Sequence, residues 1–176
     1  NVGVGAILNA HADSVLSTAT VLTAEGVVHL FNTAVALESL LGSGTVTLDS
    51  TVLSLNSGSF TGSLRDGVIP GSLVKESNGL LTLSGDNRYT GSTTVNGGIL
   101  TLAQGGSLAS TNLVVSSGST LNAEAGASLS SSSVLTADGT VNLFNATVNL
   151  DTLLGNGVVV LDSTALTLRS GTFSGS

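Results

Sequence analysis

The sequence contains no cysteine, methionine or tryptophan and one proline, and only 9% of its residues are charged and 3% aromatic. Without cysteine the chain has no disulfides, zinc thiolates or thiol nucleophiles. Four cationic residues against eleven acidic ones give a net charge of −7, and nucleic-acid binding depends on Lys and Arg neutralising phosphates. The same shortage disfavours an anionic membrane surface, and no apolar run approaches the roughly 18 residues of a spanning helix. We therefore expect no nucleic-acid partner and no membrane insertion by this segment.

Glycine, serine and threonine are abundant instead, with 23, 27 and 22 copies among 176 residues. The hydrophobic fraction is nevertheless 41%, supplied mainly by Leu and Val, and the mean hydropathy is +0.49. Disordered chains combine low hydrophobicity with high charge, which is the opposite composition. The chain is aliphatic enough to bury a core, and its length suits one domain or a piece of a longer array.

A long internal repeat organises the chain. Residues 8–63 align with residues 121–176 without a gap, and 33 of the 56 pairs are identical. We therefore expect residues 1–176 to form one continuous segment of a tandem array. In this division residues 1–7 end a preceding unit, residues 8–120 form one 113-residue unit, and residues 121–176 form the first half of the next.

A shorter period lies within the unit, in segments of the form Gly-x-apolar-x-apolar. The central apolar residues predict a core ladder of Leu8, Val28, Val46, Leu81, Leu100, Leu121, Val141 and Val159. Their spacings are 18 to 21 residues, apart from one gap of 35. Taken as two turns, with the missing one near Phe60–Leu64, this gap predicts six turns of about 19 residues per unit.

The local pattern indicates short strands. Apolar residues alternate with polar ones, as in Leu81/Leu83 and Val141/Leu143, and a period of two is typical of a strand with one face inward. Ser-Gly, Asn-Gly and Gly-Gly pairs between the segments favour tight corners. Short strands at nearly equal spacing predict an all-β solenoid, because a sandwich does not need equal spacing or stacked equivalents.

One segment resembles a known family. Residues 73–102 run LVKESNGLLTLSGDNRYTGSTTVNGGILTL, which is similar to the autotransporter-associated β-strand repeat, or passenger-associated transport repeat, of bacterial secreted proteins. The resemblance implies a right-handed parallel β-helix, exported to the cell surface or beyond, without catalytic residues. The positions that carry it are Gly79, Leu81, Leu83, Ser84, Gly85, Asn87, Tyr89, Thr90, Gly91, Thr94, Val95, Gly97, Gly98, Leu100 and Leu102. Arg88 and Ser92 depart from the usual Thr and Gly.

Few residues qualify as a chemical site. Acids recur at equivalent positions of the two copies, as Glu25/Asp138, Glu38/Asp151 and Asp49/Asp162. Such acids before Gly or Ser are typical turn formers, whereas calcium needs six to eight converging oxygens. The densest polar group comprises Asp66, Lys75, Glu76, Asp86 and Arg88, and we expect a solvated patch there. His11 and His29 become Glu124 and Asn142 in the second copy, which disfavours a metal or general-base role. We expect no catalytic residue, metal or cofactor.

Asn32 and Asn145 recur within Leu-Phe-Asn and predict a hydrogen-bonded asparagine ladder along the solenoid. For function, the sequence favours the structural shaft of an extracellular or cell-surface bacterial fibre or adhesin. The expected partners are further copies of the unit, end to end or side by side, and host or matrix glycans and proteins. Two alternatives remain open: a carbohydrate-active β-helix (a polysaccharide lyase or hydrolase) and a viral tail-fibre shaft.

Overall fold

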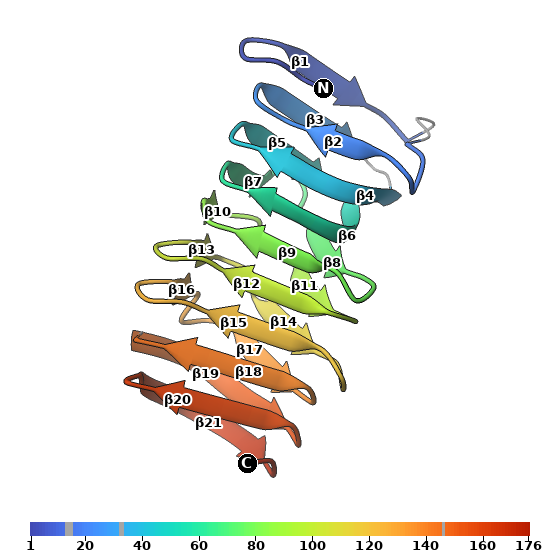
Figure 1. The fold of residues 1–176 in the computed structure, drawn as a ribbon. Coiled ribbons are helices and arrows are strands. Elements are labelled where there is room, and N and C mark those ends of the chain that lie inside the picture. Colours follow the sequence, from blue (N-terminus) through green and yellow to red (C-terminus); the bar gives the residue numbers. More distant parts are fainter. Residues whose placement is uncertain (13–15, 32–33, 146) are drawn as a thin grey trace.

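A computed structural model describes residues 1–12, 16–31, 34–145 and 147–176. In this part of the chain every regular element is a β-strand, every pair of strands is parallel, and there is no helix. The strands stack as successive layers of one column from the N-terminus to the C-terminus (Figure 1). The predicted all-β solenoid, with about 19 residues per turn, is confirmed. None of the described residues forms a helix able to span a membrane.

Each turn contributes strand segments to three faces, which we call A, B and C in chain order. Face A begins as a four-stranded sheet and continues past β7 through three very short strands. It ends on the first halves of β19 (Thr147–Gly155) and β21 (Ala165–Phe173). The other strands of face A are β1 (Ile7–Ala10), β3 (Val27–Phe31), β5 (Thr45–Asp49), β7 (Ser63–Asp66), β10 (Asp86–Asn87), β13 (Ser107–Leu108) and β16 (Ser128–Leu129).

Faces B and C belong to one 14-stranded sheet, because nine-residue strands bend from one face to the next. Face B comprises the first halves of β4 (Ala34–Gly42) and β6 (Val52–Phe60), then β8 (Ser72–Lys75), β11 (Ser92–Val95), β14 (Asn112–Val115), β17 (Val134–Ala137) and the second halves of β19 and β21. Face C comprises β2 (Val21–Thr23), the second halves of β4 and β6, then β9 (Leu80–Leu83), β12 (Ile99–Leu102), β15 (Thr120–Ala123), β18 (Thr140–Phe144) and β20 (Val158–Asp162).

The core is a column of Leu, Val and Ala side chains, because alternate residues of every strand point inward. Residues stacked in neighbouring turns are 18 to 23 positions apart, as in Ser39↔Ser57 and Gly58↔Leu81. Glycine occupies corners where neighbouring turns approach closely, as between faces C and A. A Cβ at Gly62 would lie 2.0 Å from the carbonyl oxygen of Gly44, and one at Gly85 would lie 1.8 Å from that of Gly62.

The predicted core ladder consists of inward-facing residues, but it does not follow one face. Its first three members, Leu8, Val28 and Val46, lie on face A, whereas Leu81, Leu100, Leu121, Val141 and Val159 lie on face C. The gap of 35 residues explains the change. Val46 pairs with the buried Leu64 one turn later, and Leu81 follows on face C of that same turn.

The gap therefore spans one turn and two faces, not two turns. Counting faces from β3 to its equivalent β18 gives 17 strand segments. The expected six turns per unit would need 18 strand segments on three faces. The unit has 17 segments, which make five and two-thirds turns.

Candidate functional site

The turns at residues 73–102 differ from the rest of the core by burying polar side chains. Lys75 ends β8 with its side chain inside the column and no exposed surface. Its Nζ donates to the carbonyl oxygens of Glu76, Ser77 (2.9 Å) and Gly97 (3.1 Å), which uses all three ammonium protons. Burial lowers the pKa of Lys75, and the neighbouring Glu76 carboxylate partly opposes that shift.

Asn87 of β10 is a buried amide on face A. Its Oδ1 accepts the backbone N–H of Leu64 at 3.2 Å, and its Nδ2 donates to the carbonyls of Gly85 (3.0 Å) and Ser107 (3.1 Å). One side chain therefore joins the turn below to the turn above. It replaces ladder hydrogen bonds at the point where face A narrows to two-residue strands.

Tyr89 is the only tyrosine in the sequence and is fully buried. Its hydroxyl lies 2.6 Å from Oγ1 of Thr93, which is also buried. Burial is the main reason that the pKa of Tyr89 is raised well above its usual value. The hydrogen bond with Thr93 lowers this pKa, and the nearby Asp66 carboxylate raises it further. The hydrogen bond lets the core bury an aromatic ring without leaving its hydroxyl unsatisfied.

Buried hydroxyls continue this pattern at the corners between faces. Ser110 donates to the carbonyl of Gly91 at 2.7 Å, and Ser119 donates to that of Val95 at 2.7 Å. Ser133 donates in turn to the carbonyl of Ser110. In the described part of the chain, every buried side-chain nitrogen and oxygen has a hydrogen-bond partner. Polar groups thus connect successive turns without an unpaired group in the core.

The other residues of the family motif take structural positions. Gly79, Gly91 and Gly98 lie where a Cβ would meet the backbone of the preceding turn at 2.6, 2.0 and 2.4 Å. The inward-facing leucines and valine of the motif are fully buried: Leu81, Leu83, Val95, Leu100 and Leu102. The motif therefore alternates core-filling residues with glycines at points of close approach.

The polar group expected at residues 66–88 does not form one patch. Lys75 is buried, and Glu76 points outward at the corner between faces B and C, where it accepts from Asn96. Asp66 accepts the backbone N–H and hydroxyl of Thr90. Among these five residues, Asp86 and Arg88 form the one ion pair between side chains, and both side chains are exposed. The Ser107 hydroxyl, followed by the Arg88 side chain, lowers the pKa of Asp86.

A polar column that the sequence analysis missed runs along the corner between faces B and C. In it acids and amides alternate: Asn56 donates to Glu38 at 2.8 Å, and Asn96 donates to both oxygens of Glu76 at 3.2 Å. Ser116 continues the column by donating to Asn96. In the sequence, this column corresponds to polar residues directly after the face B strands. The sequence alone does not show which strands share a face, so the column could not be predicted from it.

The predicted asparagine ladder stays a prediction, because Asn32 lies outside the described residues. Asn145 occupies an exposed turn with φ of 46°, where its backbone N–H donates to the carbonyl oxygen of Asp162. A different amide ladder joins Asn142 to Asn122 on face C, with Nδ2 2.9 Å from Oδ1. Both asparagines lie at the same register position of parallel strands β15 and β18.

The remaining candidates lie apart. Glu25 sits at the corner between faces C and A and accepts from Ser43, whereas its equivalent Asp138 sits between faces B and C and accepts from Asn156. His11 and His29 both stack on the ring of Phe31, at centroid distances of 4.9 and 5.8 Å. Among the described residues there is no group of three or more His, Asp or Glu side chains that could hold a metal, and no pocket.

Comparison with known families gives one match. Residues 73–102 match the passenger-associated-transport-repeat family, which confirms the resemblance seen in the sequence. Searches of curated proteins and of solved structures found no significant match. The matched residues are those that carry the buried lysine, asparagine and tyrosine. A passenger-associated repeat within a β-solenoid fits the shaft of an autotransporter passenger and suggests a secreted or cell-surface protein.

Proposed function

We propose that this chain is a non-enzymatic segment of the shaft of a secreted or cell-surface bacterial fibre or adhesin. The family match within an uninterrupted solenoid is the observation that carries the proposal. Parallel strands stacked about 4.8 Å apart place the hydrogen-bond ladders along the long axis. A pull along that axis then loads many ladder bonds in each turn, which suits projection, spacing or linkage.

The outward surface suits weak adhesion. Its strand positions are filled mostly by hydroxyl and amide side chains, as in Thr82, Thr120 and Asn122 of face C. Such groups are easily hydrated and offer many hydrogen-bond donors and acceptors. Host or matrix glycans and proteins are therefore the proposed contacts, with biofilm matrix as one setting.

Copies of the chain are the other proposed partner. On the side of the column, Leu80 and Ile99 stack in register on face C with 51% and 37% of their surface exposed. Lateral contact with a second copy would cover both side chains. In sedimentation velocity we expect concentration-dependent assembly that the double variant L80N/I99N weakens. A wild-type chain that remains monomeric at every accessible concentration contradicts this association.

Two measurements separate the shaft from the alternatives. Incubation with a panel of acidic and neutral polysaccharides should release no reducing ends or unsaturated products. Product release by the purified chain that disappears in acid-to-amide variants such as Asp66→Asn would support the carbohydrate-active alternative. An intertwined trimer in sedimentation equilibrium would instead support a tail-fibre shaft, although here one chain encloses its own core.

A further inference from the structure

The two copies of the repeat have the same strands but different faces. Strands β3, β4, β5 and β6 of the first copy recur 113 residues later as β18, β19, β20 and β21, with identical lengths. Yet β3 lies on face A and β18 on face C. Likewise β4 bends from face B to face C, whereas β19 bends from face A to face B. Every equivalent element is thus displaced by one face.

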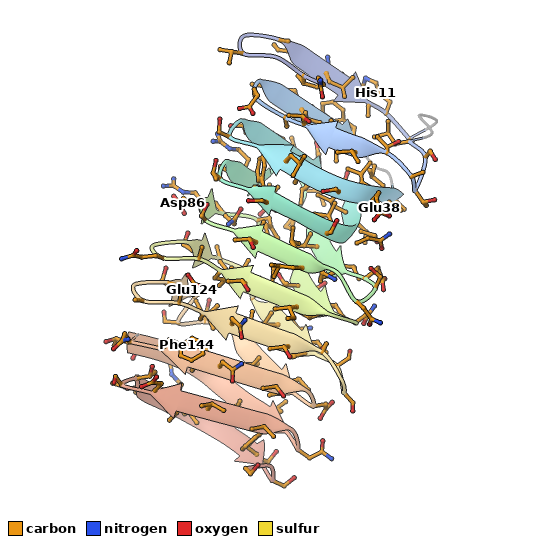
Figure 2. The ribbon with its side chains drawn as sticks, in the orientation of Figure 1. His11, Glu38, Asp86, Glu124 and Phe144 are labelled. Carbon is orange, nitrogen blue, oxygen red and sulfur yellow. The ribbon has the colours of Figure 1, made fainter. Side chains whose placement is uncertain are left out.

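The glycine corners show the same displacement independently. In the first copy Gly62 approaches Gly44 at the corner between faces C and A. In the second copy Gly175 approaches Gly157, also at 2.0 Å, at the corner between faces B and C. Figure 2 shows the result for another equivalent pair, since His11 lies at the right edge of the column and Glu124 at the left.

We infer that the repeat unit and the solenoid turn are out of phase by one face, so that tandem units display each unit-specific surface group on the three sides in succession. Three units would comprise 17 complete turns and return a group to its starting face. The inference concerns how surfaces are presented and does not depend on the proposed function. It follows from 17 strand segments per unit on a three-faced column.

The phase difference also moves the acids kept in both copies. The members of each pair, Glu25/Asp138 and Glu38/Asp151, are placed at two different corners. The display suits partner molecules that each engage one side of the shaft, so that one fibre connects neighbours in several directions. A single flat partner would meet a given group only at every third unit.

Distances between spin labels test the inference in the chain as it is, because the absence of cysteine allows selective labelling. The variant S43C/N156C labels exposed equivalent positions at two different corners. The matched control E38C/N156C labels two exposed positions of one corner, six turns apart. At about 4.8 Å per turn, the control pair is separated by roughly 29 Å along the axis.

We expect the S43C/N156C distance to exceed the E38C/N156C distance, although its positions are closer both in sequence and along the axis. The excess comes from crossing the column and from labels that point to different sides. If repeat and turn were in phase, the order would reverse, because positions 43 and 156 would then stack on one corner while 38 and 156 would not. Equal distances or the reversed order overturn the inference. Circular dichroism of each labelled variant establishes that the strands are retained.

Discussion

The aliphatic turns around β4 and β6 and the family-matched turns around β8 to β12 fill the same core with different chemistry. On face B the inward position is occupied in successive turns by Leu55, Lys75 and Val95. All three side chains are fully buried. The difference lies in the backbone that follows. After Leu55 the strand continues, whereas after Lys75 the chain turns through Ser77, which has a φ of 55°.

That turn brings the carbonyl oxygens of Glu76 and Ser77 to the ammonium group, and Gly97 in the next turn of the solenoid supplies the third. A charge is thus accommodated where a leucine would otherwise pack. Aliphatic side chains stabilise the column without distinguishing one turn from the next, since burial is non-directional. A directional group such as Lys75 or Asn87 is satisfied in one register only. We therefore expect the family-matched turns to set the register of the stack and the aliphatic turns to supply most of its stability.

The largest effect is expected when a lysine is moved to the aliphatic turn. Leu55→Lys places a charge at the equivalent inward position without the turn that supplies carbonyl partners, so it should destabilise the fold by about 4 kcal/mol or more. Urea unfolding followed by circular dichroism measures the loss. The matched variant Ser54→Lys, on the outward side of the same strand, should change stability by less than about 0.5 kcal/mol. Comparable losses of stability in Leu55→Lys and Ser54→Lys would contradict the expectation that the aliphatic turns cannot accommodate a buried lysine.

Removing the buried lysine should have the next largest effect. Lys75→Met keeps the length of the side chain but leaves the carbonyls of Ser77 and Gly97 without their donor, at a cost of about 2–3 kcal/mol. The exposed Arg88→Met serves as control. Because array unfolding need not be two-state, amide hydrogen exchange in β8 and β11 should locate the loss. A methionine variant as stable as wild type would show that the charge has no structural part.

Tyr89 tests the stability of the same turns at a single buried hydrogen bond. Tyr89→Phe removes one buried hydrogen bond and should cost about 1 kcal/mol. Since the folded pKa of Tyr89 is raised, its contribution is fully present below the usual tyrosine value near 10 and is lost as pH rises above it. The wild type should therefore lose stability in alkali faster than Tyr89→Phe. Tyrosinate absorbance checks this directly, because ionisation near pH 10 in the native chain would contradict the burial of this ring.

The smallest effect is expected at the surface of the matched turns. The folded pKa of Asp86 lies below its usual value of 3.8, so its bonds to Ser107 and Arg88 stabilise the fold above that pH and are lost as pH falls through the lowered value. Asp86→Asn should flatten this slight acid dependence. Urea midpoints at pH 5 and pH 3 provide the measurement, and an unchanged acid slope in Asp86→Asn would exclude Asp86 as its source.

Several features were predictable from residue patterns and others were not. Alternation such as Leu81/Leu83 located the strands, and the 113-residue repeat located their equivalents. The polar core was harder to foresee, because Lys75 appears in the sequence as one more surface charge and is recognisable only when the carbonyls of residues 76, 77 and 97 are in place. The contact between Glu38 and Asn56 was not predictable for a related reason. The two residues are 18 positions apart and become neighbours only when the turns stack.

The sequence by itself determined the class of fold, the length of a turn and the identity of the family-matched segment, because these depend on local periodicity, glycine placement and a contiguous motif. Tertiary structure alone decided which face each strand occupies, and hence that a unit advances by five and two-thirds turns. The reason is physical: an inward leucine looks the same on any face of a three-sided column. A unit that is one strand segment short of six full turns moves every later strand to another face. The hydrophobic pattern of those strands stays the same.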